Sequence, residues 1–517
     1  MTDDKGDNHA PKWTRRSVLG TSTAMSVGAG LFALTGSPAQ AQPGARDIPE
    51  DWDEEFDVVV IGSGFAGLSA AYEARMAGAS VVVLEKMPSL GGNSAISGGF
   101  WSVAGTPLQD EQGIEDSSEK LLEDMLAAGL DMNHVDLARI VAEDAESLRW
   151  SIEEIGVEYR ENLVHLGGHS VARSYHTAAG DGSGITRPLI DRLRENDVDP
   201  RTGVALVRLL RDADGRVKGV AVRDGVPFPD DGSGEMRHIK AGKAVVLATG
   251  GFGNDVAFRM LQDPRLKDGF SSTNQPGSTA EALREAFNIG CTPIQVSWIQ
   301  LLPPLSPDER GFGLGFDFGV MTTLHGIWID TYTGERFVNE LADRKTRADA
   351  MLRVGDKTIA IADADGAERV EAETMEQLLN RDVVMRFDTL DEMADAHDIP
   401  LDALEETVSN WNASVEEGED AQWGRSLQRD QTSLDTPPFY AMRLTPKIHH
   451  TMGGVGINTE AQALDVSTGE VIDGLYCAGE VTGGVHGAVR LGGCAYADSI
   501  VFGRIAGRNA AAEDSWA

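Results

Sequence analysis

A glycine-rich turn between an apolar strand and a helix constrains the fold of this chain more than any other feature. Residues 56–61 (FDVVVI) have the continuous apolar pattern of a buried strand, and the turn GSGFAG follows at 62–67. Residues 68–78 then have the pattern of a helix, and residues 80–86 (SVVVLEK) that of a second strand. This order predicts a doubly wound, Rossmann-like α/β domain that binds a dinucleotide.

Each glycine of the turn has a separate physical role. Gly62 permits the tight turn, Gly64 lets the backbone approach a pyrophosphate, and Gly67 lets the helix pack closely on the strand. The start of the helix adds free N–H donors and a dipole, which attract the phosphates. Glu85, at the end of the second strand, is placed to accept hydrogen bonds from ribose hydroxyls.

A second glycine cluster follows directly, in the stretch EKMPSLGGNSAISGGF at 85–100. A simple nicotinamide site does not need this cluster, so it suggests a longer ligand that runs from the pyrophosphate toward a flavin. Two later strands, within 244–253 and 474–484, also end in glycine, where a backbone can approach a cofactor. Residues 204–222 have the pattern of a β-hairpin.

The N-terminus has the organisation of an export signal. An arginine pair at 15–16 precedes a moderately apolar run at 18–34, and small residues stand at 39–41. This organisation predicts a cleaved signal peptide of the twin-arginine type at 1–41. The alternative is a transmembrane anchor, which is disfavoured because the run is short and rich in Ser, Gly and Thr.

A polar linker is expected after the cleavage site, at 42–55. No second apolar run of spanning length follows, so no membrane insertion is expected after cleavage. The twin-arginine route carries folded proteins, which suits a chain that must acquire a cofactor before export. We therefore expect a periplasmic or otherwise extracytoplasmic location.

Charge and cysteine content exclude several classes of partner. The formal net charge of −37 disfavours nucleic acid and anionic lipid, because both are negative. A solvated acidic surface explains this charge, and a salt-adapted source would give the same balance. Cys291, Cys477 and Cys494 form no CxxC or CxxCH motif, so neither a zinc knuckle nor a c-type haem is expected in this chain.

The stretch HHTMGGV begins with two of the eleven histidines, His449 and His450. By themselves, these residues could hold a metal, transfer protons or bind a substrate. Neighbouring side chains in an extended segment point to opposite faces, which disfavours joint binding of one ion. No further metal ligand can be nominated nearby, so no metal site is expected.

Six motifs together resemble the soluble fumarate-reductase and flavocytochrome c flavoprotein family, which includes urocanate reductases and ketosteroid dehydrogenases. These motifs are GSGFAGLSAA, EKMPSLGGNS, ATGGFG, GERFVNELADR, HHTMGG and GLYCAGEVTGGVHGAVRLGG. The resemblance implies a Rossmann-like FAD-binding domain at 56–297 and 449–517, interrupted by an α+β capping domain at 298–448. It also implies non-covalent FAD, because Asn93 stands where covalently flavinylated relatives have a histidine.

The glycine turn and the resemblance together place FAD against many short, polar or small residues. The expected cofactor-binding residues are Gly62, Gly64, Phe65, Ala66, Gly67, Glu85, Lys86, Gly91, Gly92, Asn93, Ser94, Ser97, Gly98, Gly99, Val204, Ala248, Thr249, Gly250, Gly251, His450, Gly479, Glu480, Arg490, Gly493 and Ala495.

The resemblance also implies the catalytic residues. His449 and Arg490 would hold a carboxylate or carbonyl of the substrate, and His450 would lie beside the flavin. Arg344 would protonate one alkene carbon after flavin N5 gives hydride to the other. An arginine can donate a proton only where it is buried, crowded by positive groups and quickly reprotonated. The alternative is a surface cation, since Lys345 and Arg347 stand beside it.

Two departures from the family pattern bear on the substrate. Leu302 stands where fumarate reductases carry a histidine for the second carboxylate, and a leucine cannot pair with that charge. Met321 and Thr323 match a substrate-side motif, but the glutamate and arginine that feed protons to the catalytic arginine are missing. His325 either replaces this proton relay or is an ordinary packed histidine. Fumarate is therefore not the expected substrate.

Three functions remain open on the sequence alone. The first is an exported ene-reductase of an α,β-unsaturated small molecule, which receives electrons from a separate cytochrome-like partner. The second is a dehydrogenase or oxidase that desaturates a substrate next to a carbonyl. The third is an exported flavin-binding electron carrier, which the retained His449, Arg344 and Arg490 disfavour. Of these, the sequence favours the ene-reductase.

Overall fold

The structure, a computed structural model, describes residues 48–516. The predicted signal peptide at 1–41 and the first part of the predicted linker lie outside these residues. Within 48–516, no helix has both the length and the apolar character needed to cross a membrane.

A mixed sheet forms the centre of the nucleotide-binding domain, in the order β18-β19-β8-β1-β2-β5. The strands are β1 (Glu54–Ile61), β2 (Val81–Glu85), β5 (Arg201–Thr202), β8 (Glu235–Leu247), β18 (Gln462–Leu464) and β19 (Val471–Cys477). β1 pairs in parallel with β2 and β8, so that Val60 lies opposite Val83 and Val246. All three valines are fully buried, as expected for the centre of a parallel sheet. The predicted doubly wound α/β class is confirmed.

The predicted hairpin extends this sheet. β6 (Val204–Arg211) and β7 (Val217–Asp224) pair antiparallel, and β7 also pairs antiparallel with β8. The turn between them is closed by Asp212, which accepts hydrogen bonds from the amides of Asp214 and Arg216. This confirms the hairpin predicted at 204–222.

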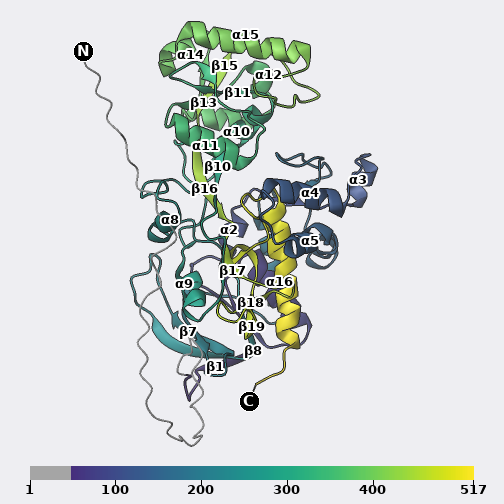
Figure 1. Ribbon diagram of the computed structural model, residues 1–517, viewed down its shortest axis with the longest axis vertical. Coiled ribbons are helices and arrows are strands. Elements are labelled where there is room, and N and C mark those ends of the chain that lie inside the picture. Colours follow the sequence, from purple (N-terminus) through teal and green to yellow (C-terminus); the bar gives the residue numbers. More distant parts are fainter. Residues whose placement is uncertain (1–47, 517) are drawn as a thin grey trace, which may run out of the picture. The chain divides into compact units, whose positions relative to one another are not determined.

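Two helices of the sheet layer pack at very close range, α1 (Phe65–Met76) and α16 (Cys494–Ala512). An ideal Cβ on Gly503 would lie 2.5 Å from the Ala66 carbonyl oxygen, and one on Gly507 would lie 2.2 Å from that of Ala70. The second contact lies four residues further along both helices than the first, so the two helices run parallel. By the same count, α16 begins about two turns before α1. Its N-terminus therefore extends past the glycine turn, and Figure 1 shows α16 as the long yellow helix.

The segment between β2 and β5 is mostly helical and adds a two-stranded ribbon. Its elements are α2 (Gly92–Ala95), β3 (Phe100–Ser102), α3 (Pro107–Glu111), α4 (Ser118–Ala128), α5 (Val135–Glu143), α6 (Glu146–Trp150), a π-helical turn (Ser151–Ile155), β4 (Ser174–His176) and α7 (Ser183–Glu195). Arg173, fully buried, pairs with Asp116 at 2.9 Å and Asp124 at 2.7 Å. Because Arg173 directly precedes β4 and Asp124 lies in α4, these ion pairs hold α4 against the ribbon of β3 and β4.

Between β8 and β10, two short helices and a minor strand complete the FAD-binding part. They are α8 (Val256–Gln262), α9 (Glu281–Asn288) and β9 (Pro293–Ile294), and β9 joins β17 (Gly454–Gly456) and β20 (Thr482–Gly483) in a three-stranded sheet. A short 3-10 turn at Gly479–Val481 follows β19. These elements bring the segments after β8, β16 and β19 together.

An antiparallel ladder carries the chain into and out of the predicted cap. It consists of β10 (Ile299–Leu305) and β16 (Thr445–Thr451), with Gln300 opposite His450 and Leu302 opposite Lys447. The boundary predicted at 298 falls just before β10, and the one at 448 falls inside β16. The two boundaries stay predictions.

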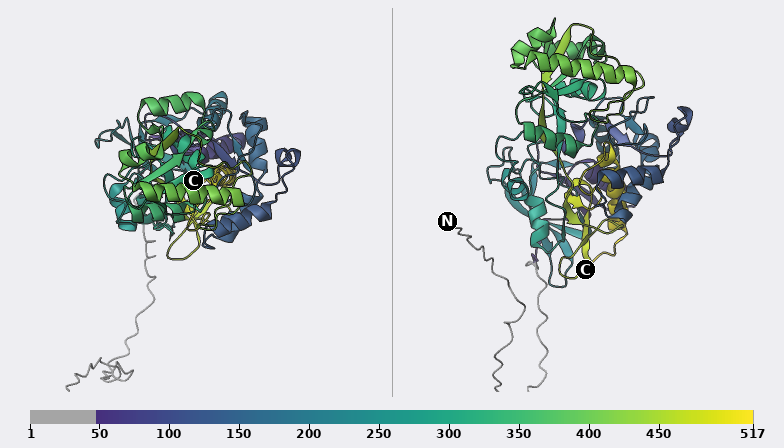
Figure 2. Two further views of the ribbon diagram at one scale, coloured as in Figure 1. Left: turned by 90° about the horizontal axis from the view of Figure 1, so that it is seen from above. Right: turned by 45° about the horizontal axis from the view of Figure 1, so that its top comes forward.

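The residues between β10 and β16 form a second sheet, in the order β12-β11-β13-β15-β14. Its strands are β11 (Ile327–Asp330), β12 (Glu335–Arg336), β13 (Thr358–Ala362), β14 (Val384–Phe387) and β15 (Phe439–Arg443). The accompanying helices are α10 (Gly315–Leu324), α11 (Arg344–Val354), α12 (Ala364–Ala367), α13 (Ala372–Asn380), α14 (Leu390–His397) and α15 (Leu401–Glu417). Figure 1 and Figure 2 show these elements together, in teal to green.

The second sheet is buried on both faces, because its side chains alternate between two apolar clusters. Trp328 and Ala360 belong to the cluster under α10 and α11, which also contains Phe318 and Met351. Ile327, Ile329 and Ile361 belong to the cluster with Trp411 of α15. Helices therefore cover the sheet on either side, which gives the α+β architecture expected for a cap.

A buried ionic network fixes the segment that leads to Arg344. Arg336 pairs with Glu340 at 2.7 Å and with Asp420 at 2.9 Å, and Arg425 pairs with Glu340 at 3.2 Å. The Arg336 and Arg425 guanidiniums both lie over the indole of Trp411, at 4.9 and 4.6 Å from its ring centroid. Since all the charges of this network are buried, removal of one partner would leave another uncompensated. The motif GERFVNE is therefore mainly structural here.

Candidate active site

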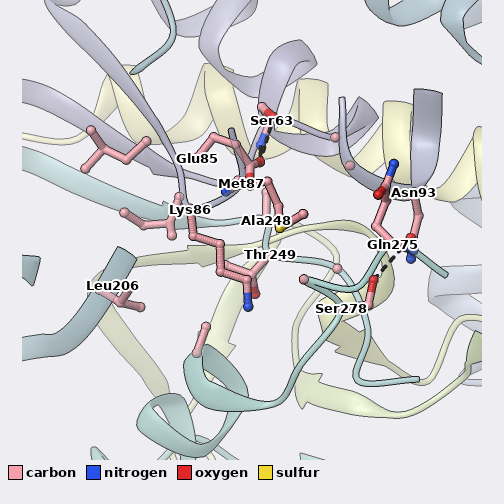
Figure 3. A pocket seen from close by; sticks show the side chains of 18 of the residues that line it. Ser63, Glu85, Lys86, Met87, Asn93, Leu206, Ala248, Thr249, Gln275 and Ser278 are labelled. Atoms are coloured by element: carbon pink, nitrogen blue, oxygen red, sulfur yellow. Dashed lines mark hydrogen bonds between the residues drawn. The ribbon is translucent and has the colours of Figure 1, made fainter. Parts of the chain in front are cut away.

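A cleft lies at the carboxyl ends of β1, β2 and β8, beside the glycine turn (Figure 3). Fifteen of the predicted cofactor residues line it: Gly62, Gly64, Phe65, Ala66, Glu85, Lys86, Gly92, Asn93, Ser94, Val204, Ala248, Thr249, Gly250, Gly479 and Glu480. Gly67, Gly91, Ser97, Gly98, Gly99, Gly251, His450, Arg490, Gly493 and Ala495 do not line it. Sequence reasoning missed Ser63, Met87, Leu206, Gln275 and Ser278, which do.

The geometry of the turn requires its first and third glycines. Gly62 has a φ of +103°, and an ideal Cβ there would lie 2.3 Å from the Ala248 carbonyl oxygen. A Cβ on Gly67 would lie 2.0 Å from the Gly62 carbonyl oxygen. A Cβ on Gly64 meets only the Ser94 hydroxyl, at 3.2 Å, so this position is open toward the cleft. The three predicted roles thus separate into two packing positions and one ligand-facing position.

The Glu85 carboxylate is held rigidly at the cleft. Its Oε2 accepts from the Ser63 hydroxyl at 2.6 Å and the Ser63 amide at 3.1 Å, and its Oε1 accepts from the Met87 amide at 2.9 Å. The Ser63 hydroxyl also accepts from the Gly91 amide at 3.0 Å, which joins the two glycine clusters. Ionised carboxylate oxygens have about four acceptor sites, so capacity remains for ribose hydroxyls.

Asn93 is fixed by the opposite wall of the cleft. Its side-chain oxygen accepts from the Gln275 amide at 2.7 Å and from the Ser278 hydroxyl at 3.1 Å (Figure 3). At the start of α1 the Phe65 amide donates to the Ser94 hydroxyl at 3.0 Å, and the N-cap residue Gly64 has no side chain to satisfy the N–H groups that follow. The glycine turn, the anchored acid and this helix N-terminus together fit the adenosine diphosphate part of FAD.

The two adjacent histidines of β16 have different surroundings. His449 Nδ1 lies 2.9 Å from the Thr273 hydroxyl, and His450 Nδ1 lies 3.5 Å from Glu480 Oε1. The two Nδ1 atoms therefore have different neighbours, which fits the alternation of side chains along the strand. Burial lowers the pKa of both rings well below the usual value, and the positive charges of Arg344 and Arg490 lower it further. Both imidazoles are therefore neutral near pH 7.

Arg344 is the first residue of α11, and its guanidinium points to the FAD-binding part of the chain. Its Nη1 donates to Gln300 Oε1 at 3.2 Å, and Gln300 Nε2 donates to the Arg490 carbonyl oxygen at 2.9 Å. Burial, then Arg490 and Arg347, lowers the pKa of Arg344 well below its usual value. Arg344 is therefore partly buried and crowded by positive groups, as two of the three stated conditions for an arginine acid require, and its rapid reprotonation stays a prediction.

Arg490 lies in a buried loop just before α16. Only 4% of the residue is exposed, and its Nη1 donates to the Leu491 carbonyl oxygen at 3.1 Å. Its buried Nε has no hydrogen-bond partner within the described chain. Gly493 caps α16 without a side-chain hydrogen bond, so the helix start is also free to donate. Arg490 and the N-terminus of α16 thus form a site that favours the binding of an anion.

The predicted substrate residues lie in three different environments. Leu302 is 3% exposed and lies in β10 opposite Lys447. Met321 belongs to the apolar cluster of the cap with Phe318, whereas the Thr323 hydroxyl donates to the Gly319 carbonyl oxygen at 2.8 Å. Packing and a local helix hydrogen bond account for Met321 and Thr323, and their substrate contacts stay predictions.

His325 ends α10 in surroundings that favour the packed-histidine alternative. Burial lowers its pKa to about 4, with a further contribution from Arg369, so the ring is neutral. Its Nδ1 is buried without a hydrogen-bond partner in the described residues, and its carbonyl oxygen accepts from Gln431. The charges that act on it are Arg369, Asp430 and Arg425, and Arg344 is not among them.

Sequence reasoning missed two residues that bond to the predicted catalytic residues, Gln300 and Thr273, and a third, Arg347, that lies beside a predicted substrate residue. Gln300 joins Arg344 to Arg490, Thr273 holds His449, and Arg347 lies 3.5 Å from the Thr323 hydroxyl with its guanidinium over Trp328. Gln300 lies two residues before Leu302 in the same strand, and alternation along that strand was the available signal.

Comparison with known proteins identifies the family. A family model described as an FAD binding domain matches residues 57–495. The chain belongs to this family. It is 41% identical to the acrylate reductase flavoprotein subunit of Shewanella woodyi, over 88% of this chain and 91% of that one. It is 35% identical to the urocanate reductase of Eggerthella lenta, over 90% of this chain and 76% of that one.

Among solved structures, the open conformation of a flavocytochrome c3 fumarate reductase is similar to this flavoprotein, with a TM-score of 0.73 and 34% identity. The similarity covers 89% of this chain and 79% of that one. The predicted family and the predicted FAD are therefore confirmed. The protein is an FAD-dependent oxidoreductase that acts on CH–CH bonds, and its family chemistry is reduction of C=C bonds.

Proposed function

We propose that this flavoprotein reduces an α,β-unsaturated acid or carbonyl compound with one polar end, and that fumarate is a poor substrate. The observation that carries the proposal is the Arg344–Gln300–Arg490 connection beside His449. It brings a proton donor and two substrate-holding groups to one place. Bound FAD supplies the hydride for one alkene carbon.

The polar end of the substrate belongs at Arg490 and His449. Negative charge builds on the carboxylate or carbonyl as hydride arrives, and preorganised donors stabilise it best. Arg490 supplies a charged donor with a free Nε, and neutral His449 supplies one N–H without adding charge. Arg344 then gives its proton to the other alkene carbon and is reprotonated from solvent.

The surroundings expected for the second carboxylate of fumarate are the reason that we propose fumarate to be a poor substrate. Leu302 offers no donor where a second carboxylate would need one, so that carboxylate would be desolvated without a charge-assisted hydrogen bond. A loss of about 2.7 kcal/mol in transition-state binding corresponds to about 100-fold in rate. The similarity to an acrylate reductase, whose named substrate has a single carboxylate, supports the same choice.

The proposal also covers the electron donor and the cellular location of the protein. We propose a separate cytochrome-like donor, because the sequence has no c-type haem motif. We also propose export by the twin-arginine route, supported by the arginine pair at 15–16 and the small residues at 39–41. Replacement of both arginines by lysine should leave unprocessed precursor in the cytoplasm. Mature protein outside the inner membrane would contradict this part.

The substrate proposal is tested with chemically reduced enzyme. We expect kcat/KM for acrylate to exceed that for fumarate by at least about 100-fold. Leu302→His should raise the fumarate-to-acrylate ratio, and Leu302→Ala, which adds no donor, serves as the matched control. A wild type that prefers fumarate would overturn the substrate argument. If oxidised enzyme desaturates propanoate faster than reduced enzyme reduces acrylate, the dehydrogenase direction holds instead.

A further inference from the structure

Phe312, in the loop between β10 and α10, and Phe316, in the first turn of α10, form an aromatic pair beside the proposed substrate-holding histidine. The ring of Phe312 meets the ring of His449 edge-to-face, with centroids 5.4 Å apart and an interplanar angle of 88°. Phe316 meets Phe312 in the same way, at 5.3 Å and 75°. An aromatic surface therefore begins directly beside the polar end of the proposed substrate site.

A second aromatic pair comes from the ribbon of the FAD-binding part. Phe100 of β3 stacks on His176 of β4, with centroids 4.2 Å apart. An ideal Cβ on Gly98 would lie 3.5 Å from Phe100 Cδ2 and 4.0 Å from Phe316 Cε1. Phe100 and Phe316 thus flank the same glycine, and we call Phe100, Phe312 and Phe316 the aromatic wall.

The aromatic wall is not part of the packed interior. Each of its three rings is partly exposed, and none belongs to the four apolar clusters of the described residues. Phe318, two residues after Phe316, is fully buried in the cap cluster and shows the contrast. The wall therefore offers apolar ring faces and edges that the protein itself does not cover.

The loop that carries Phe312 and leads to Phe316 is held by a buried carboxylate, that of Glu309, and a buried ammonium, that of Lys447. The Glu309 carboxylate accepts from the amides of Leu314 at 3.2 Å and Gly315 at 2.7 Å, and it pairs with Arg381 at 2.9 Å. The Lys447 ammonium, fully buried, donates to the carbonyl oxygens of Glu309 and Gly311. Such preorganisation is typical of a binding surface, because less ordering is required when a ligand binds.

Lys447 also connects the loop between β10 and α10 to Leu302, the residue that we propose disfavours a second carboxylate. It lies in β16 directly opposite Leu302, two residues before His449. Its ammonium is used by the loop carbonyls and does not serve as a partner for a second carboxylate. Phe312 and Phe316 therefore present aromatic rings beside His449, and Leu302 lies in the strand that pairs with β16.

We propose that the aromatic wall binds an aryl ring attached to the C=C bond, so that the substrate is a 3-arylacrylate. This inference rests on the proposed function and narrows its substrate class. The carboxylate binds at Arg490 and His449, and the aryl ring packs against Phe312 and Phe316, where edge-to-face and offset arrangements are favourable. Hydride goes to the carbon that bears the ring, and Arg344 protonates the carbon next to the carboxylate.

The test compares 3-phenylacrylate with acrylate as substrates of the reduced holoenzyme. We expect wild type to prefer 3-phenylacrylate by about tenfold or more in kcat/KM, because one ring buried in an aromatic pocket is worth at least this factor. Phe316→Ala should lower the ratio of the two kcat/KM values by about tenfold. Tyr332→Ala, which removes an aromatic ring that is 80% exposed on the cap, should leave the ratio unchanged.

A binding measurement separates this inference from the proposed function. The saturated acid 3-phenylpropanoate should perturb the flavin absorbance of oxidised enzyme, and Phe316→Ala should weaken its Kd by about tenfold. If acrylate is reduced but 3-phenylacrylate is not, and 3-phenylpropanoate does not bind, the inference is overturned and the proposed function stands. If Phe316→Ala raises the 3-phenylacrylate rate, the wall merely restricts the site to acrylate-sized substrates. If 3-phenylpropanoate binds but neither acid is reduced, the wall is retained and the proposed function fails.

Discussion

Arg344 donates a hydrogen bond from Nη1 to Oε1 of Gln300 over 3.2 Å. The same amide donates from Nε2 to the carbonyl oxygen of Arg490 over 2.9 Å. One buried side chain thus links the proposed proton donor to the loop that we propose holds the substrate anion. The Gln300 oxygen is also neutral, so it orients Arg344 without stabilising its positive charge as a carboxylate would.

Replacement of Gln300 should therefore reduce turnover more than substrate binding. Gln300→Ala removes one hydrogen bond to a charged group, worth about 1.5–3 kcal/mol, and should lower kcat by about 10–100-fold. Gln300→Glu keeps the shape but adds a negative charge, which favours the charged form of Arg344 and weakens it as an acid. We expect kcat to fall further in Gln300→Glu, with KM for acrylate changed less. Equal kcat for the two variants at all pH values would argue against charge as the cause.

The positive charge of Arg347 should help to keep the pKa of Arg344 low. It is buried with its guanidinium over Trp328 at 5.5 Å, and its positive charge contributes to the lowered pKa of Arg344. Arg347→Gln removes that charge, so the pKa of Arg344 should rise and proton donation at neutral pH should slow. The check is a pH–rate profile, in which the variant should recover toward wild type as pH increases. The exposed Arg353→Gln should keep the wild-type profile.

The sequence predicted the cofactor cleft well because its signals are local. Gly62 and Gly67 show their roles within one strand–turn–helix unit, and Glu85 ends the next strand. Short-range rules for turns and helix starts apply directly to such a unit. Ser63 was missed because its role depends on how the folded chain brings two turns together. Its hydroxyl donates to the Glu85 carboxylate and accepts from the Gly91 amide.

The cofactor glycines should respond differently to substitution. Gly67→Ala places a Cβ 2.0 Å from a backbone oxygen, so we expect loss of folded protein. Gly64→Val needs only a small shift of the Ser94 hydroxyl, 3.2 Å from the new Cβ, but directs bulk toward the cleft, so the protein should fold and retain little FAD. The measurements are circular dichroism and the ratio of flavin to protein absorbance, before and after acid precipitation. Acid should release intact FAD from wild type, because Asn93 offers no nucleophile for a covalent link; a yellow pellet would contradict this.

The active site could be predicted only in part, because most of its contacts are long-range. Arg344, His449 and Arg490 were assigned by resemblance, but their supporting partners are far away in the chain. Gln300 reaches residues 44 and 190 positions away, and Thr273 reaches His449 across 176 positions. Met321 shows a second limit, since a motif match predicts a substrate contact while the side chain lies in an apolar cluster of the cap, so that contact stays a prediction. No periodic pattern distinguishes these outcomes.

Glu480 gives the chain a pH-dependent stability. It lies beside His450, and its Oε1 accepts from the Thr451 amide at 2.9 Å. Burial raises the pKa of Glu480 from 4.5 to about 7, although Arg490 and the hydrogen bonds from Thr451 and Asn93 oppose the shift. The folded state therefore keeps a proton that the unfolded state releases between these two values. The associated stability is fully present below about pH 4.5 and is lost as pH rises through about 7.

Glu480→Gln should remove this dependence, because the amide keeps an acceptor for the Thr451 N–H and never ionises. We expect the variant to gain in Tm over wild type as pH increases from 5 to 7.5, and the gain to level off above that. The full effect is at most about 3 kcal/mol, since each pKa unit corresponds to about 1.4 kcal/mol. Thermal unfolding of the flavin-free protein measures it, with the exposed Glu470→Gln as control for simple charge removal. A Glu480→Gln advantage that stays constant or shrinks across this range would show that Glu480 is ionised in the folded protein, with Arg490 as its dominant partner.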